Sequence, residues 1–160
     1  MRILILAASF ALMAAILSSP SWAQGAASTN PAEAQAVRAI VLEFGKRLRS
    51  VAVLAPKDVA AAEIDQAYAN LVAPDLLAAW KNKPEAAPGK LTSSPSPERI
   101  DITSVKPDGP EAYTVSGKVI LLTDQERRSG GVFQANPVEI TVARRQGKWV
   151  ITKYGEKQGK

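Results

Sequence analysis

Residues 111–122 have the sequence EAYTVSGKVILL, in which apolar side chains recur at every second position. The alternating residues are Tyr113, Val115, Val119 and Leu121, with Gly117 between them. This period of two predicts a long β-strand that buries one face. Ile120 and Leu122 would face the other way, so we expect the end of the strand to be covered on both sides.

Turn signals separate this strand from further alternating segments. Residues 107–110 have the sequence PDGP, residues 129–131 are Ser-Gly-Gly, and Gln146 precedes Gly147. Proline and glycine supply the backbone angles that tight turns need. The alternating positions are Ile100 and Ile102, then Val138, Ile140 and Val142, and finally Trp149 and Ile151. About four strands joined by hairpins predict a meandering antiparallel sheet.

Before the strands, apolar residues recur at the spacing of helices. Asn30 is a suitable N-cap with proline after it, and Glu33 would complete a capping box, so the first helix is predicted over 30–53. A second helix should begin at Asp58 or its neighbours, and a short third helix should cover 74–80. Three helices followed by an antiparallel sheet predict an α+β fold, with the helices packed on one face of a curved sheet.

Residues 82–97 are rich in proline and serine and cannot form a regular element. Two interpretations fit this composition equally well. The segment is either a flexible linker, which would allow a helical unit and an independent sheet, or a loop pinned across the open end of the sheet. Leu91 is the apolar residue that would anchor such a loop.

The order of these elements resembles the NTF2-like, or cystatin-like cone, superfamily. The resemblance rests on the helical runs 30–53 and 58–80 and on the hairpin strands 111–125 and 132–154. LVAPDLLAAW, residues 71–80, is similar to a stretch of small exported bacterial proteins, most of which are uncharacterised, and GKWVI, residues 147–151, resembles the last strand of the superfamily. The resemblance implies a single domain over 30–156, with the sheet curved into a cone and the helices across its mouth.

The superfamily implies two kinds of function. Some members are small-molecule isomerases, cyclases or dehydratases with an acidic base and tyrosines inside the cone. Others are not catalytic and bind proteins, or form the extracytoplasmic part of secretion and conjugation machinery. This chain matches no complete catalytic constellation residue by residue, and the common Asp-His pair is impossible because the chain has no histidine.

The N-terminus has the pattern of a secretory signal peptide. Arg2 precedes the uncharged apolar run 3–17, and Ser21 and Ala23 are small residues at the positions that signal peptidase recognises. The run is shorter than the roughly 20 residues of a membrane-spanning helix. We therefore expect cleavage between Ala23 and Gln24, and no stable membrane insertion afterwards.

With cleavage at this site and a domain over 30–156, the sequence predicts a signal peptide over 1–23, a disordered lead-in over 24–29 and a tail over 157–160. The mature protein would be periplasmic or extracellular. Because the chain has neither cysteine nor histidine, it excludes disulfides, thiolate chemistry and any catalytic pair that needs histidine. No metal site and no cofactor are expected. The basic residues are scattered among acidic ones, so nucleic-acid binding is not expected either.

The candidate ligand-binding residues are the aromatic side chains on the predicted apolar stripes, namely Tyr68, Trp80, Tyr113 and Trp149. They would line an apolar cavity inside the cone, although the same pattern also fits a plain hydrophobic core. A catalytic carboxylate would come from Asp65, Asp101 or Asp124, paired with a tyrosine. The simpler interpretation places these aspartates on the polar faces of their elements, and no catalytic residue is assigned.

The sequence thus favours an exported, non-catalytic domain that binds a protein partner or a small apolar ligand in the cell envelope. The alternative is an exported isomerase or dehydratase, which requires an aspartate or glutamate that points into a pocket deep enough for a substrate. Membership of a larger envelope assembly is a third option, which an exposed apolar sheet face would favour. A homodimer is also left open.

Overall fold

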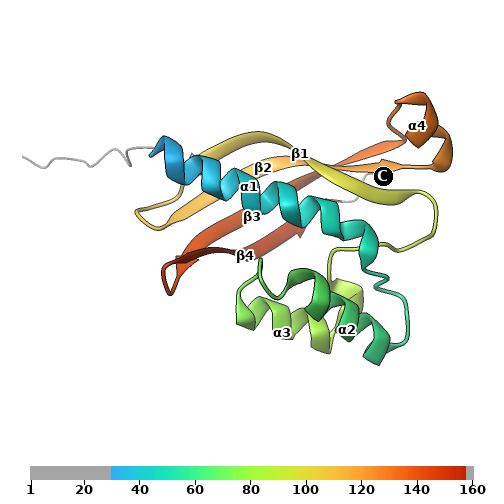
Figure 1. Cartoon of the computed structure of the whole chain (residues 1–160), viewed down its shortest axis with the longest axis horizontal. Coiled ribbons are helices and arrows are strands. Elements are labelled where there is room, and N and C mark those ends of the chain that lie inside the picture. Colours follow the sequence, from blue (N-terminus) through green and yellow to red (C-terminus); the bar gives the residue numbers. More distant parts are fainter. Residues whose placement is uncertain (1–29, 158–160) are drawn as a thin grey trace, which may run out of the picture.

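The computed structural model describes residues 30–157 and has a four-stranded antiparallel sheet with the strand order β1-β2-β3-β4 (Figure 1). The strands are β1 (Ser96–Pro107), β2 (Ala112–Leu122), β3 (Gln134–Arg145) and β4 (Lys148–Glu156). Helices α1 (Pro31–Arg47), α2 (Lys57–Tyr68) and α3 (Pro74–Asn82) precede the sheet, and α4 (Asp124–Ser129) lies between β2 and β3. The α+β class and the antiparallel meander are confirmed, and the sheet does not close into a barrel. The predicted signal peptide, its cleavage site and the lead-in lie outside the described residues.

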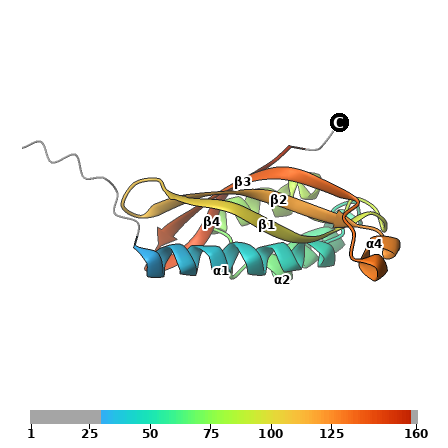
Figure 2. The ribbon, with the colours of Figure 1, turned by 90° about the horizontal axis from the view of Figure 1, so that it is seen from above.

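Helix α1 lies along one face of the sheet (Figure 2) and begins where the sequence predicts. The Asn30 side chain accepts a hydrogen bond from the Ala32 amide at 3.1 Å, which caps the helix. The carboxylate of Glu33 has a different role from the predicted capping box. It accepts a hydrogen bond from the Arg144 guanidinium at 2.7 Å and so ties the start of α1 to β3.

The first helix is shorter than predicted. It ends at Arg47, a single 3₁₀ turn covers Leu48–Ser50, and Val51 has an extended backbone. The Val51 carbonyl accepts a hydrogen bond from the Lys90 amide at 2.7 Å, and Ala52 forms a β-bridge with Lys90. The chain therefore leaves the helix because its backbone pairs with the loop between α3 and β1.

A glycine brings α1 into close backbone contact with β1. A Cβ atom added at Gly45 would lie 2.7 Å from the backbone nitrogen of Ile100. Around this contact the buried side chains of the helix meet those of the inner sheet face, and they include Val37, Val41, Phe44, Ile140 and Ile151. The main hydrophobic core therefore lies between α1 and the sheet.

Helices α2 and α3 lie beside the β4 edge of the sheet (Figure 1). Residues 71–73, which connect them, pair with β4. The Ala73 amide donates to the Ile151 carbonyl and the Ile151 amide donates to the Leu71 carbonyl, both at 2.8 Å. These bonds satisfy backbone groups that an edge strand would otherwise expose.

The proline-rich segment 82–97 is pinned to the rest of the fold. The Tyr68 hydroxyl donates to the Pro88 carbonyl at 2.7 Å, and Ala87 is buried in the core that the helices share with the sheet. Leu91, the predicted anchor, is 47% exposed, so this part of the prediction is wrong. Of the two interpretations of the segment, the pinned loop matches the structure.

The predicted strand over 111–125 is too long, because its last residues begin helix α4. Thr123 is the N-cap of this helix, and its hydroxyl accepts from the Gln125 amide at 3.2 Å. The Glu126 carboxylate accepts from the Thr123 amide at 3.0 Å, which completes a capping box. Threonine followed three residues later by glutamate is the sequence signature of this motif.

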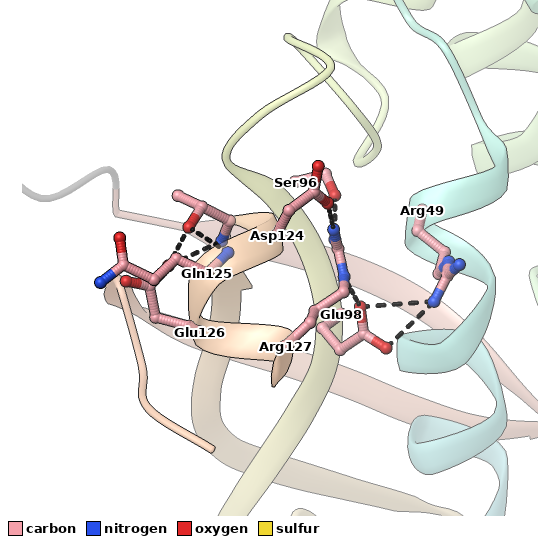
Figure 3. A network of polar contacts seen from close by, with 8 residues as sticks. Arg49, Ser96, Glu98, Asp124, Gln125, Glu126 and Arg127 are labelled. Atoms are coloured by element: carbon pink, nitrogen blue, oxygen red, sulfur yellow. Dashed lines mark hydrogen bonds and ion pairs between the residues drawn. The ribbon is translucent and has the colours of Figure 1, made fainter. Parts of the chain in front are cut away.

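Arg127 ties α4 to the start of β1 (Figure 3). Its guanidinium donates to Ser96 at 2.6 Å, to Asp124 at 2.9 Å and to Glu98 at 3.1 Å. Arg49 donates to the same Glu98 carboxylate at 3.1 Å. Hydrogen bonding to Glu98 is the main reason that the pKa of Arg127 lies above its ordinary value. The network positions α4, and because solvent reaches its charges we expect it to add little stability.

Replacing Gly45 by alanine should destabilise the fold although alanine is the better helix former. The added methyl group would lie 2.7 Å from the Ile100 nitrogen. Overpacking of this kind costs about 1–3 kcal/mol, against a gain in helix propensity of about 1 kcal/mol. Urea unfolding should show a net loss of stability. Gly155→Ala is the matched control, because its added Cβ would find its nearest atom at 3.9 Å. An equal loss in both variants would contradict the close contact.

Candidate ligand-binding cavity

A cavity of about 600 Å³ lies at the end of the sheet where β2 and β4 end and β3 begins, under the loop 82–97. Its apolar wall includes Leu48, Pro95, Pro97, Val119 and Leu121. Its polar wall includes Gln134, Asn136, Tyr154 and Glu156. Cavities of roughly 300–1,000 Å³ with an apolar wall and a few placed polar groups are typical of small-molecule sites.

The polar wall is a chain of hydrogen bonds that ends on a carboxylate. The Gln134 Nε2 donates to Asn136 Oδ1 at 2.7 Å, and Asn136 Nδ2 donates to Glu156 Oε1 at 2.8 Å. The Tyr154 hydroxyl donates to Glu156 Oε2 at 2.6 Å. Asn136 is only 4% exposed. Each oxygen of the Glu156 carboxylate is therefore oriented by its own neutral donor.

A β-bulge in β4 turns these residues toward the cavity. Val142 pairs with Ile151 but Thr141 pairs with Lys153, so Thr152 is an extra residue in β4. The Thr152 hydroxyl donates to the Thr141 carbonyl at 3.3 Å. Because side chains alternate along a strand, one extra residue reverses the faces of all that follow. Tyr154 and Glu156 therefore join Ile151 on the inner face.

The β3–β4 ladder continues past the last residue of β4. The Lys157 amide donates to the Pro137 carbonyl at 2.9 Å. Lys157 follows the last residue of β4 and is the first residue of the predicted tail over 157–160, whose other residues lie outside the described range. This last bond anchors the strand end that carries Glu156.

Tyr154 connects the cavity to the aromatic part of the core. Its ring centroid lies 5.8 Å from that of Phe44 and 6.2 Å from that of Trp80. Burial raises the pKa of Tyr154 far above its ordinary value, and the negative charge and hydrogen bond of Glu156 raise it further. The hydroxyl therefore stays protonated and serves as a hydrogen-bond donor at ordinary pH.

The structure separates the four aromatic residues that the sequence singled out. Tyr68 and Trp80 pack on each other at 5.8 Å in the core next to Tyr154. Tyr113 and Trp149 pack at 5.4 Å at the opposite end of the sheet. None of the four is among the residues that line the cavity. Their predicted contact with a ligand stays a prediction, and the tyrosine at the cavity is Tyr154.

Tyr113 and Trp149 belong to a separate cluster around Arg144. The Arg144 guanidinium lies 4.8 Å from the Trp149 ring centroid, and it donates to Glu33 at 2.7 Å. Burial raises the pKa of Tyr113, and the nearby Glu33 carboxylate raises it further. This cluster fastens the N-terminal end of α1 to the sheet and accounts for the burial of Tyr113 and the partial burial of Trp149.

The three aspartates considered for catalysis form ion pairs at the surface. Their partners are Lys81 for Asp65 at 2.5 Å, Arg99 for Asp101 at 2.8 Å and Arg127 for Asp124 at 2.9 Å. Their side chains are 49%, 50% and 77% exposed, in the same order. The simpler interpretation of these residues thus matches the structure, and the carboxylate at the cavity is Glu156.

The comparisons with known proteins identify no relative. A scan against protein-family models gave no match, and neither curated proteins nor solved structures matched the chain. The NTF2-like resemblance therefore stays a prediction. Within residues 30–157, no helix is long and apolar enough to cross a membrane. The same residues contain no group of three or more acidic side chains placed to hold a metal ion.

The ionisation of the tyrosines should report on this arrangement. Because the pKa values of Tyr68 and Tyr154 are raised by burial, neither should form phenolate in the folded protein near pH 10, where free tyrosine titrates. The folded state then loses stability only above about pH 10, by roughly 1.4 kcal/mol per pH unit for each tyrosine that ionises only on unfolding. Absorbance at 295 nm during an alkaline titration measures this directly.

The control for that titration is the same protein in urea, in which all three tyrosines of the chain should ionise together. In the Tyr154→Phe variant, the free energy of unfolding should fall less steeply with rising pH above pH 10. Full phenolate absorbance near pH 10 in protein that is still folded would contradict the buried positions of Tyr68 and Tyr154.

Proposed function

We propose that this protein is exported and that its domain binds a small molecule in the cavity under the loop 82–97, without converting it. The observation that carries the proposal is the Glu156 carboxylate, held by Asn136 and Tyr154 in the wall of a cavity of about 600 Å³. The sequence left a protein partner and a small ligand open, and the cavity favours the small ligand.

The construction of the site supports binding. The apolar part of the wall provides contact with the body of a ligand, and the fixed carboxylate provides one oriented polar contact. Because Asn136 and Tyr154 already fix Glu156, a ligand does not have to order this side chain when it binds. The loop that covers the cavity is itself held by the hydrogen bond from Tyr68 to Pro88.

The alternative function, an isomerase or dehydratase, receives some support from the same carboxylate. Its requirement was an aspartate or glutamate that points into a pocket deep enough for a substrate, and Glu156 lines the cavity. Such an enzyme also needs a donor aimed at the substrate. Here the Tyr154 hydroxyl and the Asn136 amide both donate to Glu156 itself. These two groups thus donate to the carboxylate and not to a substrate, which favours binding over catalysis.

The third option, a subunit of a larger envelope assembly, would be favoured by an exposed apolar sheet face. The sheet face opposite α1 carries Lys118, Glu139 and Lys153 at exposed positions. A face with these charges gives that option no support. A homodimer formed through another surface stays an open proposal.

Export is tested by the N-terminus of the protein isolated from its own cells. We expect the first residue to be Gln24 and the protein to be found outside the cytoplasm, because signal peptidase requires the small residue Ala23. N-terminal sequencing and intact mass measure this. The variant Ala23→Leu should accumulate as precursor, whereas Ala27→Leu should be processed normally. Wild-type protein that keeps Met1 and stays in the cytoplasm would contradict export.

Ligand binding is tested with a neutral probe, 2-naphthylmethanol, titrated into the mature protein. We expect chemical-shift changes at Val119, Leu121 and Tyr154 in NMR spectra, because these residues line the cavity. Leu121→Trp should fill the cavity and abolish the shifts. Val132→Trp is the matched control, since Val132 is 50% exposed and lies outside the lining. Shifts that persist unchanged in Leu121→Trp would place the binding elsewhere.

A further inference from the structure

The charge of the cavity is opposite to that of the whole chain. The chain has 20 lysines and arginines against 15 acidic residues. The residues that line the cavity include two glutamates, Glu85 and Glu156, and no lysine or arginine. Glu85 is exposed, whereas Glu156 is partly buried between Asn136 and Tyr154. The cavity is thus an acidic pocket in a basic protein.

Glu156 differs from Glu33 and Glu98, two other partly buried glutamates, in the charge of its partners. Glu33 accepts a hydrogen bond from Arg144, and Glu98 accepts from two arginines. No ion pair within residues 30–157 involves Glu156, whose hydrogen-bond donors are the neutral groups of Asn136 and Tyr154. Among the described residues, this carboxylate is therefore oriented by neutral donors and has no cationic partner.

We propose that the ligand of this cavity is an organic cation, with an apolar body against the Leu121 wall and a protonated amine against Glu156. This inference rests on the proposed function. An ammonium group has three donors and no acceptor, and a carboxylate accepts about four hydrogen bonds. Asn136 and Tyr154 donate one each, so the cation adds to the existing bonds without displacing them.

The other charge classes of ligand fit this site less well. Any ligand that fills the cavity removes water from Glu156, and a carboxylate without water needs a compensating positive charge. A neutral ligand provides none, so it should bind more weakly than a cation of the same shape. An anionic ligand adds repulsion at short distance, with no lysine or arginine in the lining to offset it.

The test uses three probes with one aromatic body: 2-naphthylmethylamine as the cation, 2-naphthylmethanol as the neutral compound and 2-naphthoate as the anion. Each is titrated into the mature protein at low salt by calorimetry. We expect the amine to bind about tenfold or more tightly than the alcohol, and the naphthoate to show no binding. The preference for the amine should shrink in high salt because ions screen the charges.

The other outcomes of these titrations distinguish failure of the cation inference from failure of the proposed function. Equal affinity for the amine and the alcohol, or tighter binding of the naphthoate, would overturn the cation inference and leave the proposed function standing. No binding of any probe would overturn both. These measurements need no variant, so they stay decisive even where a substitution in the cavity prevents folding.

Variants then locate the charge that the amine meets. Glu156→Gln should abolish the preference for the amine over the alcohol. Glu139→Gln is the matched control, because Glu139 is exposed on the opposite face of β3, and it should keep the preference. If Glu85→Gln abolishes the preference and Glu156→Gln does not, the assignment to Glu156 is wrong.

Discussion

A cluster of four aromatic rings holds the helices that precede the sheet against it. Phe44 of α1 lies 4.7 Å from Tyr68 of α2, 6.2 Å from Trp80 of α3 and 5.8 Å from Tyr154 of β4, measured between ring centroids. Aromatic pairs of this kind contribute about 0.5–1.5 kcal/mol each beyond the area they bury. Tyr68 also fixes the loop over the cavity, and Tyr154 also donates to Glu156. The packing that holds the helices therefore also builds the cavity wall. A substitution of Tyr68 or Tyr154 would affect both.

The bulge at Thr152 allows β4 to contribute Tyr154 and Glu156 to this arrangement. Without the extra residue, strict alternation from Ile151 would direct Lys153 inward and Tyr154 outward. The aromatic cluster would lose its contribution from the sheet, and a lysine would replace Glu156 as the charged group nearest the core. One residue of register thus determines both the packing of the helices and the sign of the charge at the cavity. Bulges next to functional sites commonly act in this way, by re-aiming side chains.

The sequence predicted the α+β class, the order of the elements and the burial of the aromatic residues, because these follow from periodicity and turn chemistry. It did not predict that Tyr154 and Glu156 face the cavity. The alternation of the residues before a β-bulge does not show that an extra residue follows. Tyr154 and Glu156 fall on the outer face in any regular alternation from Trp149. The capping box of Thr123 and Glu126, by contrast, was present in the sequence and could have shown that β2 ends at Leu122.

The partners of Glu156 bear on the choice between binding and catalysis. A partly buried carboxylate without a cationic partner costs stability. A glutamine has a single acceptor oxygen, whereas Asn136 and Tyr154 donate to two different oxygens, so these hydrogen bonds need a carboxylate. A ligand cation would offset the charge while the bonds from Asn136 and Tyr154 persist. A catalytic base, in contrast, works with a second group that donates to the substrate, and Asn136 and Tyr154 both donate to Glu156 itself. The two donors that orient Glu156 therefore leave the other acceptor positions of its carboxylate for a ligand cation.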